Sequence, residues 1–167
     1  NLGNALEAPK EGEWGVTLKE EYFQLIKDKG FNSVRIPVRW SAHALAEAPY
    51  TIDSAFFERI DWAVNQALSR GLAVVLNMHH YEEIFKEPEA HQERFLAIWK
   101  QIAEHYQDYP DELLFEPLNE PNSAMTAGLW NDLAAEVLQV VRISNPERVV
   151  VMGPVEWNSV YRINTLE

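Results

Sequence analysis

Short apolar runs alternate with longer amphipathic stretches along this chain. The runs are rich in Val, Ile, Leu and Phe without strict alternation, which is typical of strands buried on both faces of a parallel sheet. They begin every ~30–40 residues, about the length of one strand–helix unit. We predict five strands, at residues 2–6, 33–38, 73–78, 113–118 and 149–153.

The stretches between these runs predict helices. Thr17 and Glu20 form a capping box for the first helix, which Gly30 ends. Asp53 caps a second helix that runs to Gly71. The third helix carries an apolar stripe of Phe95, Ile98, Trp99, Ile102 and Tyr106. A fourth, capped by Thr126, carries Leu129, Leu133, Val137 and Val141.

Repeated strand–helix units predict a parallel α/β sheet with right-handed crossovers. Two architectures compete, an open doubly wound sheet and a (β/α)8 barrel. No glycine-rich phosphate loop follows the first strand, where Asn4-Ala5-Leu6-Glu7 stands instead, and this weighs against a dinucleotide fold. Polar residues gather where the strands end, as in a TIM barrel. We therefore predict a (β/α)8 TIM barrel, although Pro117 conflicts with a strand over 113–118 because it cannot donate to a ladder.

Composition narrows the classes of partner. The formal charge of −12 disfavours nucleic acid and anionic membranes, and no apolar run approaches the ~20 residues of a membrane span. The absence of cysteine excludes disulfides, thiolate zinc sites and a Cys nucleophile. No signal peptide is visible, and because the chain begins at Asn1 we expect a trimmed N-terminus. The compartment stays open, with a secreted location favoured over a cytoplasmic one.

The most informative polar group is the Asn119-Glu120 pair, which ends an apolar run directly before Pro121. An acid beside an amide is poor core material, and at a strand end it faces the mouth of a pocket. A structural carboxylate paired with an Arg is the alternative reading of Glu120. Glu116 shares the Glu120 face but lies deeper, and we interpret it as a structural partner, with Arg35 the candidate.

Five motifs together resemble glycoside hydrolase family 5, and in particular bacterial endo-β-1,4-glucanases, some of which also cut mannan. The Asn-Glu-Pro motif alone is weak, but the combination is specific in this order and spacing. The motifs are Asn4-Ala5-Leu6-Glu7, Arg35-Ile36-Pro37-Val38-Arg39-Trp40, His79-His80-Tyr81, Asn119-Glu120-Pro121 and Glu156-Trp157.

The resemblance implies a role for each matching residue. Glu120 matches the general acid/base, Asn119 the residue that hydrogen-bonds the sugar 2-hydroxyl, and Arg35 the Arg that supports the nucleophile. Substrate-contacting positions are matched by Asn4, Glu7, His79 and His80. Exposed rings also suit a carbohydrate cleft, because sugar C–H faces stack on them, and the aromatic residues in loops after strands are Trp14, Tyr81 and Trp157.

Retaining cleavage needs two carboxyls ~5–5.5 Å apart. The family's nucleophilic Glu belongs to the seventh strand, so we expect residues 1–167 to be the first five βα units of one catalytic domain, with strands six to eight outside the chain. The expected partners are a β-1,4-linked glucan, mannan or both, and the missing C-terminal part of the barrel. No organic cofactor is implied, and a metal is disfavoured because neighbouring residues such as His79 and His80 point to opposite faces.

Two further hypotheses stay open. The chain is either part of a barrel that binds polysaccharide without cutting it, or a truncated fragment inactive by itself. The intact Asn119-Glu120 pair disfavours the first of these, because a pure binder has no need of the acid.

Overall fold

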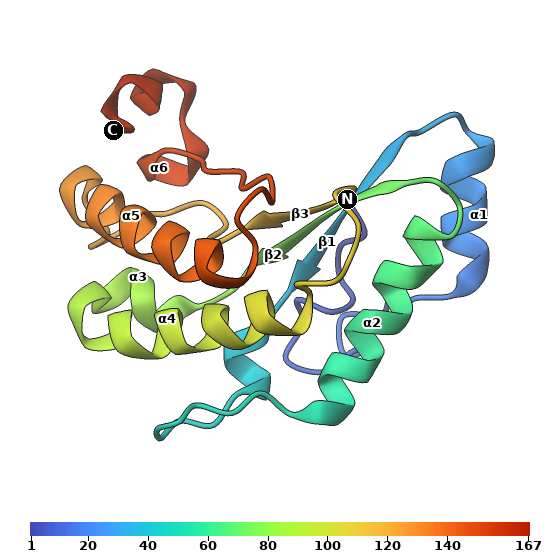
Figure 1. Ribbon diagram of the computed structural model, residues 1–167, viewed down its shortest axis with the longest axis horizontal. Coiled ribbons are helices and arrows are strands. Elements are labelled where there is room, and N and C mark those ends of the chain that lie inside the picture. Colours follow the sequence, from blue (N-terminus) through green and yellow to red (C-terminus); the bar gives the residue numbers. More distant parts are fainter.

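A three-stranded parallel sheet lies at the centre of the molecule (Figure 1). The computed structural model describes all 167 residues. The strands β1 (Ser33–Val38), β2 (Ala73–Met78) and β3 (Leu113–Glu116) pair in the order β1-β2-β3. The register aligns Pro37 with Asn77 and Asn77 with Glu116, so the carboxyl ends of all three strands meet at one edge.

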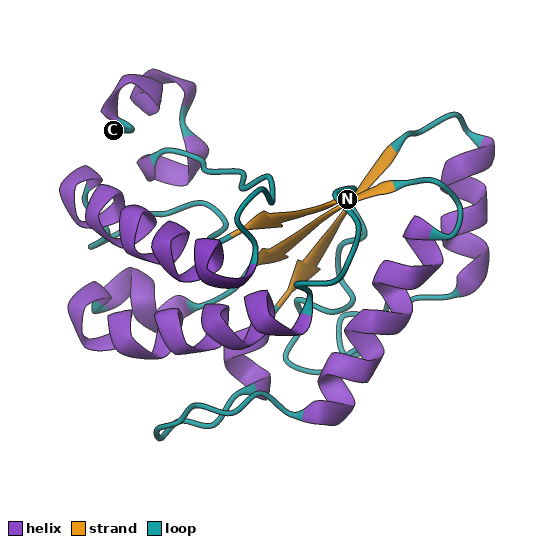
Figure 2. Ribbon diagram, viewed as in Figure 1, coloured by secondary structure: helices purple, strands orange, loops and turns teal.

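Helices connect the strands and lie around the sheet (Figure 2). In this view α1 and α2 lie to the right of the strands and α3, α4 and α5 lie to the left of and below them, with α4 packed along α5. None of the helices has both the length and the apolar character that a membrane crossing needs. Their bounds are α1 (Glu20–Asp28), α2 (Ser54–Leu68), α3 (Glu82–Lys86), α4 (Pro88–His105), α5 (Ala127–Ser144) and α6 (Val155–Asn158), with 3-10 turns η1 (Trp40–His43) and η2 (Val160–Thr165).

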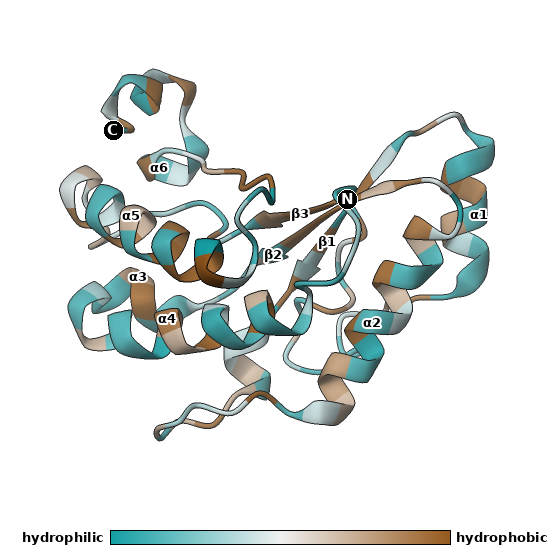
Figure 3. Cartoon of the chain, viewed as in Figure 1, coloured by the Kyte–Doolittle hydropathy of each residue, from teal (hydrophilic) through white to brown (hydrophobic).

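The two faces of the sheet differ in burial. Apolar residues make up much of β2 and β3 (Figure 3), and the strand residues that alternate toward the helices are buried. They are Val34, Ile36, Val38, Val74, Leu76, Met78, Leu113 and Phe115. The opposite face carries Asn77 and Glu116 at the carboxyl ends and, two residues below them, Arg35 level with Val75 and Leu114, and it is only partly covered. Helices thus cover one face only, as in part of a barrel and unlike a doubly wound sheet.

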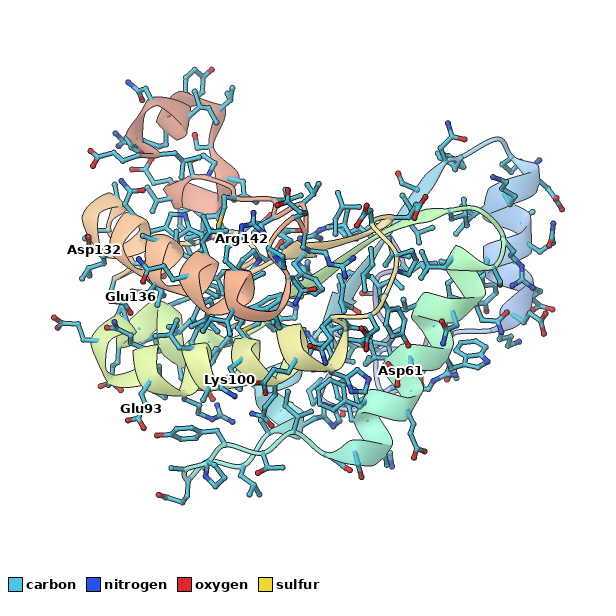
Figure 4. All side chains as sticks on the ribbon, in the orientation of Figure 1. Asp61, Glu93, Lys100, Asp132, Glu136 and Arg142 are labelled. Carbon is cyan, nitrogen blue, oxygen red and sulfur yellow. The ribbon has the colours of Figure 1, made fainter.

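The outer surface of the helix layer is charged. Figure 4 shows Asp132 and Glu136 on α5 and Glu93 on α4 directed away from the sheet. Gln92 of α4 donates to Glu136, which joins the two helices at this surface. These acidic residues therefore belong to the solvated outer faces of amphipathic helices and are not part of the polar cluster at the strand ends.

Two of the five predicted strands are not regular strands. Residues 2–6 run beside β1, but only the bonds Leu2 N to Arg35 O (2.9 Å) and Arg39 N to Leu6 O (3.0 Å) join them. Pro37 lies between those two positions on the same edge and has no N–H to donate, so a regular ladder cannot form there. Residues 149–153 meet β3 through a single bridge between Phe115 and Val150.

Most of the predicted helix ends are confirmed. Asp53 caps α2 through Ala55 N (2.9 Å), Thr126 caps α5 through Leu129 N (3.3 Å), and Gly30 and Gly71 adopt positive φ at helix ends. The Thr17 capping box is wrong, because α1 begins after Lys19 with no side-chain cap. The conflict over Pro117 disappears because β3 ends at Glu116.

Arg148 holds together the connection between α4 and β3. It is 5% exposed, and its guanidinium donates to the carbonyls of Tyr106, Tyr109, Pro110 and Leu113 and to Asn145 Oδ1. Buried carbonyls require donors, and here one side chain satisfies four of them.

Replacing Arg148 with Met should therefore destabilise the fold, since it leaves buried carbonyls unpaired. We expect a loss of roughly 3–5 kcal/mol in the free energy of unfolding, measured by urea denaturation of a complete barrel containing this chain. The control is Lys100→Met, which removes an exposed ion pair with Glu104 and should cost less than about 1 kcal/mol. Equal midpoints for the two variants would contradict this role of Arg148.

Candidate active site

Backbone hydrogen bonds continue past the ends of the strands and bring the predicted site residues together. His79 N donates to Val38 O (2.8 Å), and Asn119 N donates to Met78 O (2.9 Å). The first bond extends the β1–β2 ladder by one residue, and the second joins the segment three residues beyond β3 to the last residue of β2. His79 and Asn119 therefore lie at neighbouring positions directly beyond the sheet edge.

Three buried tryptophans anchor the same edge. Trp40 Nε1 donates to Asn77 O (3.1 Å), Trp99 Nε1 to Pro117 O (2.9 Å) and Trp130 Nε1 to Gly153 O (2.8 Å). Each indole comes from the helical layer and satisfies a carbonyl where a strand or predicted strand ends. The apolar spacing of the third helix predicts Trp99 only as a core residue, and no local pattern marks the carbonyl that its indole meets.

Arg35 forms the centre of the site. Its Nε and Nη2 donate to the two carboxylate oxygens of Glu116 at 2.6 and 2.7 Å, a bidentate ion pair in which the Glu116 side chain is 8% exposed. Nη2 also donates to Asn119 Oδ1 (2.7 Å). Nη1 lies 3.4 Å from both Asn1 Oδ1 and His79 Nδ1. The predicted pairing of Glu116 with Arg35 is thus confirmed.

His79 is a neutral group in this setting. Burial lowers its pKa to about 4, with further lowering by the charge of Arg35 and by His80. Its Nδ1 also lies 3.3 Å from Asn77 Nδ2. Asn77 itself is fully buried, and its Oδ1 has no hydrogen-bond partner.

Glu120 follows Asn119 in a constrained turn. Its φ is +49°, its side chain is half-buried, and its carbonyl accepts from Asn122 Nδ2 (2.6 Å). The next residue, Pro121, accepts a backbone bond from Trp157 N (3.3 Å). The turn thus ties the end of β3 to α6 while the Glu120 carboxylate makes no bond within the chain.

Trp157 is 61% exposed and directly follows Glu156 in a left-handed turn. Glu156, Trp157 and Asn158 have φ values of 58°, 59° and 58°. A Cβ at position 153 would stand 2.0 Å from Asn158 Oδ1, so a larger residue there would require the Asn158 side chain to move. The backbone bond from Trp157 N to Pro121 O holds Trp157 next to the turn that contains Glu120.

In the N-terminal segment Asn4 is open to a ligand, as expected, whereas Glu7 is not. Asn4 is exposed with φ +64°, but Glu7 is 4% exposed and its carboxylate accepts the backbone N–H groups of Asn4 and Ala5. Glu7 therefore holds the turn that presents Asn4 instead of facing a ligand itself. The reason is local, because the backbone N–H groups of this turn have no backbone acceptor and the Glu7 carboxylate is the nearest group that can accept from them.

His80 and Tyr81, the two ring residues that follow His79, differ in burial. His80 stays partly exposed, with its ring edge-on to Trp14 at 5.6 Å between centroids and to His79 at 4.8 Å. The prediction that Tyr81 is an exposed platform is wrong. Its side chain is fully buried beneath α4, and its hydroxyl lies 3.1 Å from His91 Nδ1. No group of three or more His, Cys, Asp or Glu side chains is placed to hold a metal ion.

Comparisons with known proteins place the chain in a family. The profile of cellulase, glycosyl hydrolase family 5, matches residues 3–167. Endoglucanase H of Acetivibrio thermocellus is 43% identical over 159 residues, which cover 95% of this chain and 18% of that protein. Endoglucanase A of Ruminococcus albus is 38% identical over 143 residues, covering 78% of this chain and 39% of that protein.

Solved structures agree. Endoglucanase Cel5A of the hyperthermophilic Thermotoga maritima is 53% identical, with a TM-score of 0.98, over all of this chain and 54% of that chain. The cellulose synthase subunit Z of Clostridioides difficile is 44% identical, with a TM-score of 0.96, over all of this chain and 55% of that one. The chain thus spans about half of these structures, and the predicted fold, the first part of a (β/α)8 barrel, is confirmed. This chain belongs to glycoside hydrolase family 5, the cellulase family.

Proposed function

We propose that residues 1–167 form the N-terminal part of a single catalytic domain of a retaining, endo-acting glycosidase that cleaves β-1,4-linked glucan and mannan. The observation that carries the proposal is the Arg35 cluster, which fixes Asn119 next to Glu120 at the mouth of the sheet. The relatives named endoglucanase support this reaction class. Structures of the Thermotoga maritima protein with mannotriose and with cellobiose support a cleft that accepts both kinds of sugar.

In this mechanism Glu120 is the general acid/base. It donates its proton to the glycosidic oxygen while a second carboxylate, outside this chain, attacks the anomeric carbon and forms a glycosyl-enzyme. Glu120 then removes a proton from water, which displaces the sugar from that carboxylate. The proton returns to Glu120, so the enzyme is regenerated.

Arg35 determines which atoms its neighbours offer to a sugar. A guanidinium only donates, so the Asn119 atom 2.7 Å from it is the carbonyl oxygen, and the Asn119 NH2 group remains to donate outward. By the same reasoning, Nδ1 of His79 accepts and its Nε2 carries the proton. Both residues thus present donors to sugar oxygens, in agreement with a hydrogen bond from Asn119 to the 2-hydroxyl.

The incomplete sheet also implies a partner. Val149 and Val151 are 52% and 39% exposed on the face opposite the helices, and the chain covers 54% of the Thermotoga maritima structure. A wide apolar face next to an unpaired strand edge is prone to association. We propose that the C-terminal part of the barrel covers this face and supplies the nucleophile.

Glu120→Gln in the complete enzyme should lower kcat by roughly 10²–10⁴-fold on soluble cellulose or mannan, because the leaving oxygen is then not protonated. Reducing-sugar release measures this. An aryl glycoside whose leaving group needs no protonation should lose far less rate in the glycosylation step. The matched control is Glu112→Gln, which removes an exposed carboxylate at the opposite end of β3. A near-normal rate for Glu120→Gln on polysaccharide would sink the assignment.

His79 should stay neutral across the physiological range. We expect its imidazole to titrate with a midpoint near pH 4 instead of the ordinary 6.5, with the proton on Nε2 above that pH. Long-range proton–nitrogen NMR spectra report both the midpoint and the tautomer. A proton on Nδ1 near pH 7 is the result that contradicts the donor pattern, and Arg35→Gln should shift the midpoint upward because it removes a neighbouring positive charge.

Residues 1–167 alone should release little or no reducing sugar, because Glu120 has no nucleophile to act with. Adding the remaining strands as a separate chain should restore release from soluble cellulose. Intact mass of the sample identifies which species is active. Turnover by a pure 19.3 kDa species would show that the nucleophile lies within this chain.

A further inference from the structure

His80 and Glu82 face each other at the start of α3. Glu82 is the first residue of that helix (Figure 1), and its Oε1 lies 3.4 Å from Nδ1 of His80. The side chains of Glu82 and His80 are 52% and 30% exposed, so the contact lies on the open surface beyond the end of β2. A change at Glu82 therefore alters the surroundings of His80 without disturbing the core.

The backbone that carries the His80 ring is held from two sides. The preceding amide, His79 N, donates to Val38 O (2.8 Å), and the carbonyl of His80 accepts from Ser41 Oγ (3.0 Å). Arg94 of α4 in turn donates to Ser41 O (2.8 Å). The ring stands edge-on to that of His79, with 4.8 Å between the centroids. The two imidazoles thus extend from a fixed segment, which reduces the entropy lost when a ligand binds both.

The Glu82 carboxylate decides which nitrogen of neutral His80 carries the proton. An ionised carboxylate only accepts, so it favours a proton on the nitrogen that faces it, Nδ1. Neutral imidazole in water prefers the proton on Nε2, so the opposite tautomer requires a partner of this kind. Glu82 is the polar side chain that contacts His80, and Nε2 makes no bond within the chain. That nitrogen therefore keeps a lone pair that can accept.

We propose that Glu82 is a positioning residue that holds His80 with its proton on Nδ1, so that Nε2 accepts a hydrogen bond from a sugar hydroxyl. The inference rests on the proposed function. Arg35 faces Nδ1 of His79 and leaves a donor at Nε2 of that ring, whereas Glu82 leaves an acceptor at Nε2 of His80. A hydroxyl both donates and accepts, so neighbouring hydroxyls of one hexose match a donor that stands beside an acceptor.

Long-range proton–nitrogen NMR spectra of the complete enzyme, at a pH where His80 is neutral, test the tautomer. The unmodified enzyme should carry the proton on Nδ1, and Glu82→Ala should move it to Nε2. Glu82→Gln should keep it on Nδ1, because the amide oxygen also accepts. The matched control is Glu83→Ala, which removes the neighbouring exposed carboxylate in the first turn of α3 and should change nothing. A proton on Nε2 in the unmodified enzyme, or an unchanged tautomer in Glu82→Ala, overturns the role of Glu82.

Calorimetry tests the contact with sugar. The Glu120→Gln form of the complete enzyme gives Kd for a six-sugar cello-oligosaccharide without hydrolysis. Adding Glu82→Ala should weaken binding roughly 3- to 10-fold, the loss of about one hydrogen bond, whereas Glu82→Gln and Glu83→Ala should leave Kd unchanged. A changed tautomer with an unchanged Kd overturns the contact. Failure of the proposed function is a separate outcome, seen as no sugar release by the unmodified enzyme, and the NMR comparison still decides the role of Glu82 in that case.

Discussion

The site depends on one buried ion pair. The Arg35 guanidinium is shared between Glu116, Asn119 and His79, and only the Glu116 carboxylate balances its charge within hydrogen-bond distance. Removing one partner of such a pair leaves an unpaired charge, which typically costs about 3–5 kcal/mol. The same pair fixes the orientation of an amide and the tautomer of an imidazole, because a group that only donates faces each of them. Stability and the donor pattern of the site thus share one cause.

The helical layer reaches the mouth of the sheet through tryptophan N–H groups. A parallel strand that ends leaves carbonyls without ladder partners, and in this protein Trp40, Trp99 and Trp130 donate to such carbonyls from η1, α4 and α5. Each indole is almost fully buried, so its ring also packs the core that joins helix to strand. These bonds tie the helices to the residues that follow the strands. The helical layer thereby fixes the positions of the polar residues at the carboxyl ends of the sheet.

Sequence reasoning succeeded where the signal was local or periodic. Three strands and the caps at Asp53 and Thr126 follow from spacing along single segments. The pairing of Glu116 with Arg35 follows from alternation along two strands of one parallel sheet. It failed where one segment's role depends on another. Pro37 interrupts pairing on an edge that only the neighbouring segment reveals, and burial of Tyr81 depends on α4 lying above it. The role of Glu7 depended on N–H groups that a turn leaves open, which no residue pattern shows.

Backbone strain gathers at the same edge as the proposed chemistry. Of the non-glycine residues with positive φ, all except Tyr50 lie in loops around the site: Asn4, Glu120, Ser123, Glu156, Trp157 and Asn158. Such conformations cost about 1–3 kcal/mol each for ordinary side chains and persist only when the surroundings impose them. Here those surroundings include the Glu7 carboxylate at Asn4, the Asn122 amide at Glu120 and the Pro121 carbonyl at Trp157. The strained backbone is therefore confined to the loops at this edge. The ion pair between Arg35 and Glu116 and the three tryptophan hydrogen bonds fix the strand ends from which those loops start.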